Sequence, residues 1–414
     1  MVYPPGSFFR FHVVCYAAMN NTVPDTSDKS FPIRSTLLLV GVFFMTFIGR
    51  TILSPLLLPI EHELGLTHAE GGSFFLVISV GLMLTMLFSG TLTQHLNHHI
   101  TIAIAGWITG IGLFLLALSG SLFVFRIGLF LIGSGAGLYL PSGVTALTDV
   151  VPGDQWGKAI AIHELGPIFG LAAGPFFAEI ALRFSDWRSL LFLLSAVSVV
   201  WSLLFIRFAR GGRFHGTPPQ WHELYKIMQQ RQFWIIAFFF VMAIGLEMGV
   251  YSMLPAYLVD ARGIDQSLVN TMVSTSRLTS LLVIFAAGWF SDKLGYRRVI
   301  AFIAVSAGLV TAMLGMRQNW ALIVGVYLQP MLVSAFFPAG FTALARVSSA
   351  RQRNLSVSLV IPIAYLFGGG AFPTLIGWLA ELGMFGAGFV GVGVLTAAGV
   401  LLIPAMEYAP ADEL

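Results

Sequence analysis

The chain has 414 residues, of which 57% are hydrophobic and only 10% are charged. Its mean hydropathy is +0.85, whereas about 25% of the residues of a soluble domain are charged. A soluble protein of this length cannot bury so much apolar surface, so the composition excludes a soluble enzyme, a disordered chain and a nucleic-acid-binding protein. The net charge of +3 is interpreted as loop charge that orients a membrane protein. The single cysteine, Cys15, excludes a disulfide scaffold or a cysteine-based metal site.

Apolar runs of about 20 residues, the length of a helix that crosses a bilayer, recur along the whole chain. Glycine and proline inside them are compatible with membrane helices, in which both are common. The sequence therefore predicts an all-α membrane protein. Its twelve transmembrane helices are expected at residues 34–59, 71–94, 99–119, 122–147, 157–182, 187–208, 232–259, 266–290, 297–316, 320–346, 354–380 and 385–407.

The lysines and arginines between these segments predict the orientation of the chain. Fifteen fall on the side that holds both termini, four fall on the other side, and Arg50, Arg126 and Arg277 fall inside predicted spans. Cytoplasmic loops carry the excess of these residues. We therefore expect a multi-pass protein of a plasma membrane of the bacterial inner-membrane type, with both termini in the cytoplasm.

A basic polar stretch at residues 209–231 separates six predicted helices from six others. The expected domains are a cytoplasmic tail at 1–33, a six-helix bundle at 34–208, a cytoplasmic linker at 209–231, a second six-helix bundle at 232–407 and a tail at 408–414. Residues 1–18 are interpreted either as an upstream extension of a chain that begins at Met19 or as part of the tail, and the sequence leaves both open.

The two halves of the chain resemble each other at an offset of about 197 residues. Residues 141–150 (PSGVTALTDV) align with 338–347 (PAGFTALARV), and residues 90–99 (GTLTQHLNHH) align with 288–297 (GWFSDKLGYR). Two pairs of prolines align in the same order, Pro59 with Pro255 and Pro175 with Pro373. Parallel repeats of six spans are an architecture of transporters, in which substrate binds between the halves near the membrane midplane.

The segment 288–298, GWFSDKLGYRR, lies between the eighth and ninth predicted helices. It closely resembles the Gly-x-x-x-Asp-Arg/Lys-x-Gly-Arg-Arg loop motif of the major facilitator superfamily, and the resemblance covers residues 34–407. The resemblance implies two six-helix bundles related by pseudo-two-fold symmetry, and transport by alternating access. The implied gating-loop residues are Gly288, Asp292, Lys293, Gly295, Arg297 and Arg298. Gly295 permits a short turn, and the charged residues are expected to hold a cytoplasmic gate through ion pairs.

The corresponding turn of the first half departs from this motif. Gln94, Asn97 and three histidines replace the acid, the glycine and the bases. A solvated polar turn is the simpler interpretation. The alternative is a pH-sensitive gate, in which protonated His98 or His99 pairs with Asp149.

Two glycine-rich segments are similar to further motifs of the family. Residues 133–137 (GSGAG) resemble its glycine-rich fourth helix, although Leu129 stands where an arginine is expected. Residues 170–178 (GLAAGPFFA) resemble the antiporter motif, with Ala178 in place of the last glycine. For this segment, close helix packing through small residues is the favoured interpretation over a signal of transport direction.

Charges inside the hydrocarbon region are costly, so each one marks a functional hypothesis. Arg50, Glu247 and Arg277 fall well inside the first, seventh and eighth spans, and Glu164 falls in the inner part of the fifth. An arginine binds a carboxylate or phosphate through two hydrogen bonds, and a buried glutamate can exchange a proton near neutral pH. We expect Arg50 and Arg277 to bind an organic anion, and Glu247 or Glu164 to carry a coupled proton. The alternative is two Arg–Glu pairs that only hold the helices together.

Other polar side chains in the spans are candidates for hydrogen bonds to a substrate, although most such groups only bind neighbouring helices. They are Tyr139, Tyr251, Asn270, Tyr327, Gln329 and Tyr365. The nine histidines lie mostly in loops and turns, and His95, His98 and His99 lack the spacing of a helical metal site. No metal ion and no cofactor is expected.

The sequence thus predicts a transporter rather than an enzyme: a monomeric, proton-coupled symporter of a small organic anion, in a lipid bilayer and without a nucleic-acid partner. A proton-driven exporter of drugs or amphiphiles is the alternative, favoured by the segment 170–178 and the 36 phenylalanines. A non-transporting sensor or scaffold of the same fold is a third hypothesis, although no long extra domain supports it. Substrate identity, transport direction and the choice between proton and sodium stay open.

Overall fold

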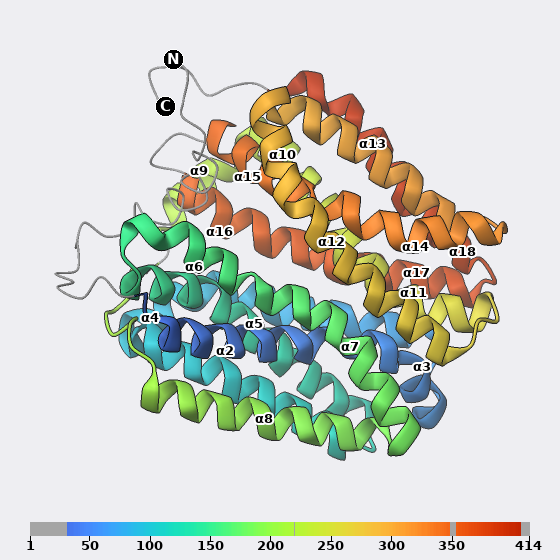
Figure 1. The fold of residues 1–414 in the computed structure, drawn as a ribbon, viewed down its shortest axis with the longest axis horizontal. Coiled ribbons are helices and arrows are strands. Elements are labelled where there is room, and N and C mark those ends of the chain that lie inside the picture. Colours follow the sequence, from blue (N-terminus) through green and yellow to red (C-terminus); the bar gives the residue numbers. More distant parts are fainter. Residues whose placement is uncertain (1–30, 219, 348–352, 407–414) are drawn as a thin grey trace. The chain divides into compact units, whose positions relative to one another are not determined.

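The structure is a computed structural model that describes residues 31–218, 220–347 and 353–406. Each of the twelve expected spans is mainly helical over its described residues (Figure 1). The choice between Met1 and Met19 and the expected C-terminal tail lie outside the described residues. The first half contains α2 (Ile33–Thr51), α3 (Leu53–Leu64), α4 (His68–Leu118), α5 (Leu122–Val150), η1 (Gly153–Gln155), α6 (Trp156–His163), α7 (Leu165–Phe184) and α8 (Trp187–Phe208).

The second half begins with a short helix, α9, in the expected linker. It contains α9 (Trp221–Met228), α10 (Arg231–Ile244), η2 (Gly245–Gly249), α11 (Val250–Ala256), η3 (Tyr257–Ala261), α12 (Gln266–Leu294), α13 (Tyr296–Leu314), α14 (Asn319–Ser334), α15 (Phe336–Val347), α16 (Arg353–Ala364), η4 (Tyr365–Ala371), α17 (Phe372–Glu381), α18 (Phe385–Ala398) and η5 (Gly399–Ala405). Three of these segments, η2, η3 and η4, are π-helical. Single π-helical turns inside membrane helices occur frequently at functional sites.

Ten helices in the described part of the chain are long and apolar enough to cross a membrane. One of them, His68–Leu118, contains both the second and the third expected spans. The eighth expected span falls in α12, part of which lies outside the residues described to the side chain, and this helix is not among the ten. The ten helices and α12 together account for the twelve expected spans.

The turn that divides α4 conserves its backbone conformation between the two repeats. Asn97 has φ 62° and ψ 164°, and Gly295, which aligns with it, has φ 81° and ψ 140°. This region of φ and ψ is adopted mainly by glycine, and Asn97 is the only non-glycine residue with a positive φ in the described chain. Its Oδ1 accepts the backbone N–H of Ile100 at 3.0 Å, as an N-cap residue does. The asparagine therefore ends one membrane helix and begins the next.

The described chain divides into two compact units that differ from the two sequence halves. Unit 1 comprises the chain up to Arg50 with Gly81–Gly170 and Arg188–Gln220, and unit 2 comprises Thr51–Val80, Leu171–Trp187 and the chain from Trp221 onward. Unit 2 therefore joins the ends of some first-half helices to the second half. Within it, Ser54 of α3 donates a hydrogen bond to the Tyr251 carbonyl at 2.7 Å.

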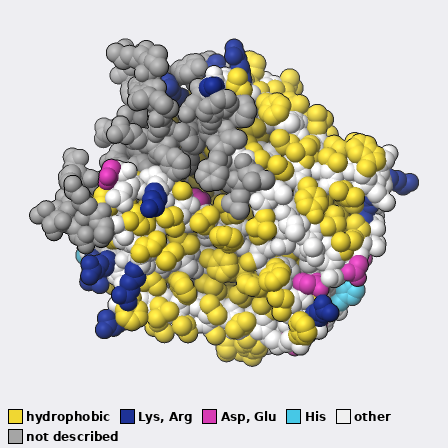
Figure 2. Space-filling model, in the orientation of Figure 1, with side chains coloured by type: hydrophobic (Ala, Val, Ile, Leu, Met, Phe, Trp, Pro, Cys, Tyr) yellow, Lys and Arg dark blue, Asp and Glu magenta, His cyan; other side chains and the backbone are white. Residues whose placement is uncertain are grey.

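Large apolar side chains cover much of the surface. Figure 2 shows hydrophobic side chains over most of the described part of one face. Some apolar side chains are more than 70% exposed, namely those of Phe184, Leu401 and Phe123. A soluble protein rarely exposes large continuous apolar patches, and lipid covers such side chains in a membrane.

Candidate substrate and proton sites

The first membrane span is interrupted close to Arg50. α2 ends at Thr51, the residue after Arg50, and α3 begins at Leu53. Pro55 has no N–H group to donate to the Thr51 carbonyl, so a continuous α-helix loses a hydrogen bond at this point. The Arg50 side chain is buried, and its guanidinium carbon lies 4.2 Å from the centroid of the Phe47 ring, one turn earlier. This cation is thus held inside unit 1 against an aromatic face.

Arg277 occupies the corresponding kind of position in unit 2. It lies in α12 with only 4% of its surface exposed, and its guanidinium carbon is 4.7 Å from the centroid of the Tyr251 ring. Its Nε has no hydrogen-bond partner in the described structure. The half-buried Glu247 of η2 acts electrostatically on the same guanidinium. Three of the predicted site residues, Arg277, Tyr251 and Glu247, are therefore brought together in one unit.

Tyr251 is fixed from both ends of its side chain. The Arg277 guanidinium covers its ring, and its Oη donates a hydrogen bond to the Leu171 carbonyl at 3.1 Å. In a regular helix that carbonyl would accept the N–H of the residue four positions later, which is Pro175 and has no N–H. The tyrosine hydroxyl thus supplies the donor that the proline removes.

The π-helical turn that carries Glu247 packs against a second π-helical segment. A Cβ atom on Gly249 would lie 2.5 Å from the carbonyl oxygen of Gly368, which belongs to η4. Only glycine permits this approach of two backbones. Gln329 also supports the turn, because its Nε2 donates to the Leu246 carbonyl at 2.7 Å. This predicted substrate residue is therefore engaged with the backbone beside Glu247.

The remaining predicted residues of unit 2 lie in other contacts. Asn270 is buried and its Nδ2 donates to the Glu179 carboxylate at 3.1 Å. The hydroxyl of Tyr327 is hydrogen-bonded to that of Thr275 at 3.0 Å, and Tyr365 opens η4. The contacts of Asn270 and Tyr327 join neighbouring helices, which is what most polar side chains of membrane bundles do.

In unit 1 the predicted residues Tyr139 and Glu164 are connected by a histidine that the sequence reasoning missed. Tyr139 Oη lies 2.9 Å from His163 Nε2, and His163 Nδ1 lies 3.3 Å from Glu164 Oε1. His163 is 1% exposed, so the expectation that the histidines lie mostly in loops does not cover it. Its place inside the fifth predicted span was a usable signal, because ionisable residues within spans are rare and often functional.

A second histidine-centred cluster, also missed by the sequence reasoning, joins helix ends within unit 2. His68 begins α4, and its Nδ1 lies 2.8 Å from Oε2 of Glu61 in α3. Its Nε2 lies 3.2 Å from Oδ2 of Asp260 in η3. Only the doubly protonated ring donates from both nitrogens, so this arrangement corresponds to an imidazolium between two carboxylates.

The gating-loop motif places its glycine as expected. Gly295 has a positive φ and precedes α13, and Arg297 donates a hydrogen bond to the backbone carbonyl of Met406. Lys293 and Arg298 are exposed. The helix α12 continues through Gly288 and Asp292, whose side-chain environment lies outside the described part. The ion pairing of this loop stays a prediction.

The alternative of a His98–Asp149 or His99–Asp149 pair is not the arrangement observed. His98 Nδ1 lies 3.2 Å from the Ser142 hydroxyl, and His99 Nδ1 lies 3.0 Å from the Gly211 carbonyl. Asp149 instead accepts the backbone N–H of Gly212 at 2.9 Å. These contacts bury His98 and His99 against the start of the linker, whereas Gln94 and His95 of the same turn are exposed, as a solvated turn predicts.

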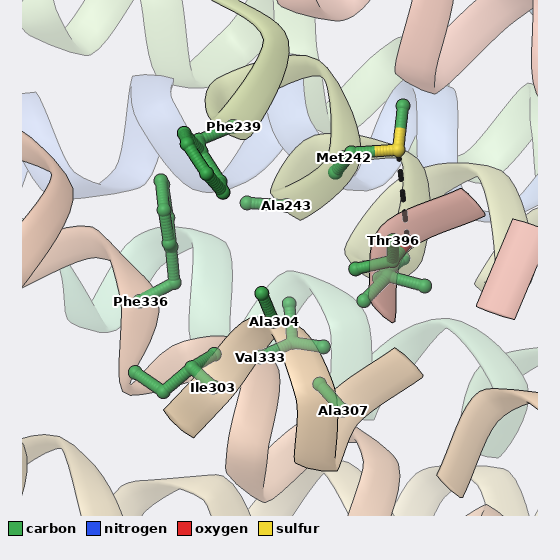
Figure 3. A pocket seen from close by; sticks show the side chains of 10 residues that line it. Phe239, Met242, Ala243, Ile303, Ala304, Ala307, Val333, Phe336 and Thr396 are labelled. Atoms are coloured by element: carbon green, nitrogen blue, oxygen red, sulfur yellow. Dashed lines mark hydrogen bonds between the residues drawn. The ribbon is translucent and has the colours of Figure 1, made fainter. Parts of the chain in front are cut away.

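An apolar pocket in unit 2 does not have the chemistry of an anion site. Figure 3 shows that it is lined by side chains such as Phe239, Phe336 and Val333, and by Thr396, whose hydroxyl contacts the Met242 sulfur. Its volume of about 20 Å³ has room for about one water molecule.

The glycine-rich segment 170–178 has a packing role, because a Cβ on Gly170 would lie 2.9 Å from a ring atom of Phe47.

Helices long and apolar enough to cross a membrane define a multi-pass membrane protein. The family model described as Major Facilitator Superfamily matches residues 39–268 and 233–413. The chain therefore belongs to this superfamily of membrane transporters and is not an enzyme. A bacterial homolog of the human lysosomal transporter Spinster has a similar structure, with a TM-score of 0.73 and 16% identity over 92% of this chain and 100% of that one.

Three relatives of the chain are named for what they transport or resist. A probable sulfoacetate transporter of Cupriavidus necator is 24% identical over 64% of this chain and 67% of that protein. A nitrite extrusion protein of Bacillus subtilis is 22% identical over 89% of this chain and 92% of that protein. A quinolone resistance protein of Staphylococcus aureus is 28% identical, but over only 34% of this chain and 37% of that protein.

Proposed function

We infer that the chain is a proton-coupled symporter of a small organic anion, working by alternating access in a bacterial inner membrane with both termini in the cytoplasm. Arg277 is the anion-binding cation, Tyr251 orients it, and Glu247 lies close enough to compensate its charge when no anion is bound. Arg50 of unit 1 is a second anion-binding cation. The orientation rests on the distribution of lysine and arginine.

The observation that carries this proposal is the environment of Arg277. A guanidinium buried in a membrane span is costly unless it has a partner or a function. Its neighbours include a tyrosine ring and a glutamate within electrostatic range, and its Nε has no hydrogen-bond partner in the described residues. A carboxylate or sulfonate offers the oxygen pair that a guanidinium binds with two parallel hydrogen bonds. Relatives named for sulfoacetate and nitrite transport support an anionic substrate.

The test is uptake into proteoliposomes that contain the purified protein. Radiolabelled sulfoacetate is supplied outside, with and without a proton gradient that is acidic outside. The proposal predicts accumulation driven by the gradient and its loss when a protonophore is added. Malonate, supplied in excess as a competitor, is expected to inhibit uptake if it shares the site.

Two substitutions connect this uptake to the site. Hydrogen bonds to charged groups contribute about 1.5–3 kcal/mol, so Arg277→Ala is expected to lower initial uptake about 10- to 150-fold. Arg277→Lys keeps the charge but loses the planar fork, and an intermediate loss is expected. Arg183→Ala, at an exposed position near the end of α7, is the control. Undiminished uptake by Arg277→Ala, or uptake that ignores the proton gradient, contradicts the proposal.

A drug exporter is the second candidate, because the quinolone resistance protein matches part of the chain. This function predicts that cells expressing the protein survive a fluoroquinolone and accumulate less of it. Resistance together with an absence of anion uptake favours the exporter over the symporter.

A further inference from the structure

The fifth membrane span is interrupted at Glu164. α6 ends at His163 and α7 begins at Leu165, with Glu164 between them at φ −69° and ψ −10°. The cause lies four residues after His163, where Pro167 has no N–H for the His163 carbonyl and its ring displaces that carbonyl. The two neighbouring side chains differ sharply in exposure: His163 is 1% exposed and Glu164 is 54% exposed.

The buried histidine belongs to a chain of polar contacts that runs across unit 1. Tyr139 Oη donates to the Leu39 carbonyl at 2.8 Å, so its oxygen is left to accept a hydrogen bond from His163 Nε2 at 2.9 Å. This pattern assigns a proton to Nε2. His163 Nδ1 then faces Glu164 Oε1 at 3.3 Å. Neutral imidazole and ionised carboxylate would place two lone pairs against each other, so one further proton belongs to this pair.

An aromatic stack holds the ring in this geometry. The Phe43 ring lies 4.4 Å from the His163 ring at an interplanar angle of 22°, and 4.9 Å from the Tyr139 ring at 17°. Gly166 lets α2 approach, because a Cβ there would lie only 3.3 Å from Phe43 Cδ1. The stacked rings fix the orientation of the buried imidazole.

The titratable groups that contact the His163 ring in the described structure are Tyr139 from α5 and Glu164 beside it. α2 contributes the uncharged Phe43. The other charged residues of these helices stand at least five positions from the contacting residue of their own helix, about 7 Å or more along the axis. They are Arg34 and Arg50 in α2, Arg126 and Asp149 in α5, Lys158 in α6, and Glu179 and Arg183 in α7.

We propose that His163 and Glu164 form the proton-carrying site of the transporter, with Tyr139 as the positioning residue that fixes the tautomer of the ring. One proton, shared between His163 Nδ1 and Glu164 Oε1, is taken up through the half-exposed carboxylate from one side of the membrane and, after access alternates, is released through it to the other side. The proposal rests on the proton coupling of the proposed function and adds the group that does the coupling.

The test compares proton-driven accumulation with substrate exchange in the same proteoliposomes. Exchange of labelled for unlabelled sulfoacetate across the membrane requires no net proton movement, whereas accumulation does. His163→Gln and Glu164→Gln keep hydrogen-bonding groups but cannot carry the proton. In both variants, gradient-driven accumulation is expected to fall at least about tenfold below that of the wild type. Exchange is expected to stay within about threefold of the wild-type rate. A pH-sensitive dye inside the vesicles is expected to report substrate-dependent acidification for the wild type and none for the two variants.

His222→Gln is the matched control, because His222 is exposed in α9. Glu164→Gln alters a half-exposed side chain and therefore keeps the test valid if His163→Gln does not fold. If transport by the wild type is coupled to protons and transport by each variant that folds remains coupled, the proposal is overturned while the proposed function stands. If the wild type shows transport without proton movement, the symport function fails and this proposal fails with it.

Discussion

The Tyr251 side chain has two roles, one for its ring and one for its hydroxyl, and two substitutions test them separately. Its ring lies under the Arg277 guanidinium, and its hydroxyl supplies the donor that Pro175 denies to the Leu171 carbonyl. Tyr251→Phe keeps the ring and removes the donor. The buried Leu171 carbonyl is then left unsatisfied, which costs about 1–3 kcal/mol of unfolding free energy. Anion affinity is expected to stay within about twofold of the wild type.

Tyr251→Leu removes the ring as well. A cation–π contact at a desolvated site is worth about 2 kcal/mol, so this variant is expected to lose stability and also to bind the anion about 10- to 30-fold more weakly. The assays are denaturant unfolding in detergent and titration calorimetry with sulfoacetate. The double substitution Tyr251→Phe with Pro175→Ala restores an N–H four residues after Leu171 and is expected to recover much of the stability lost in Tyr251→Phe.

Two results would refute this reasoning. If Tyr251→Phe unfolds like the wild type, or Pro175→Ala gives no recovery, the hydroxyl does not serve the Leu171 carbonyl. If Tyr251→Phe weakens anion binding as much as Tyr251→Leu does, the hydroxyl contacts the anion and the ring does not orient the guanidinium.

Two further predictions concern backbone packing and the repeated turn. Gly249→Ala places a Cβ 2.5 Å from the Gly368 carbonyl and is expected to destabilise the protein by about 1–3 kcal/mol in thermal unfolding. Its control is Gly391→Ala, because no atom lies within 4 Å of a Cβ at that position. The control is expected to be neutral or stabilising by up to about 1 kcal/mol. Equal stability of the two variants would contradict the close approach at Gly249. Asn97→Ala loses the cap and forces alanine to a positive φ, at a combined cost of about 2–3 kcal/mol, whereas Asn97→Gly is expected to cost a few tenths. Equal unfolding midpoints for the two Asn97 variants would disprove the conformation assigned to that turn.

The sequence predicted the helices well because length and apolar character decide membrane spans. It also related Asn97 to Gly295 by alignment alone, and the two residues share a positive φ. Charge within the spans identified Arg277 and Glu247, which are neighbours in unit 2. The contacts around them were not predictable in the same way, because Tyr251, Leu171 and Pro175 meet only through tertiary packing.

The histidine clusters were not predicted, for a different reason. Most histidines lie in loops and turns of the sequence, whereas His163 lies within a predicted span beside Glu164. The partners of His68 are seven and 192 residues away in the chain, so no local pattern indicates that cluster. The tyrosine that orders His163, Tyr139, was predicted as a substrate residue, but its hydroxyl is engaged with Leu39 and His163.

The central claim is that Arg277 binds an organic anion, and ligand-dependent thermal unfolding of the purified protein tests it most directly. A ligand that binds only the folded state raises the unfolding temperature, and the rise grows with the logarithm of its concentration relative to its Kd. We predict that sulfoacetate stabilises the wild type and the Arg183→Ala control, has no effect on Arg277→Ala, and that a cationic fluoroquinolone stabilises none of the three. Equal stabilisation of the wild type and Arg277→Ala by sulfoacetate, or stabilisation by the fluoroquinolone alone, would contradict the account.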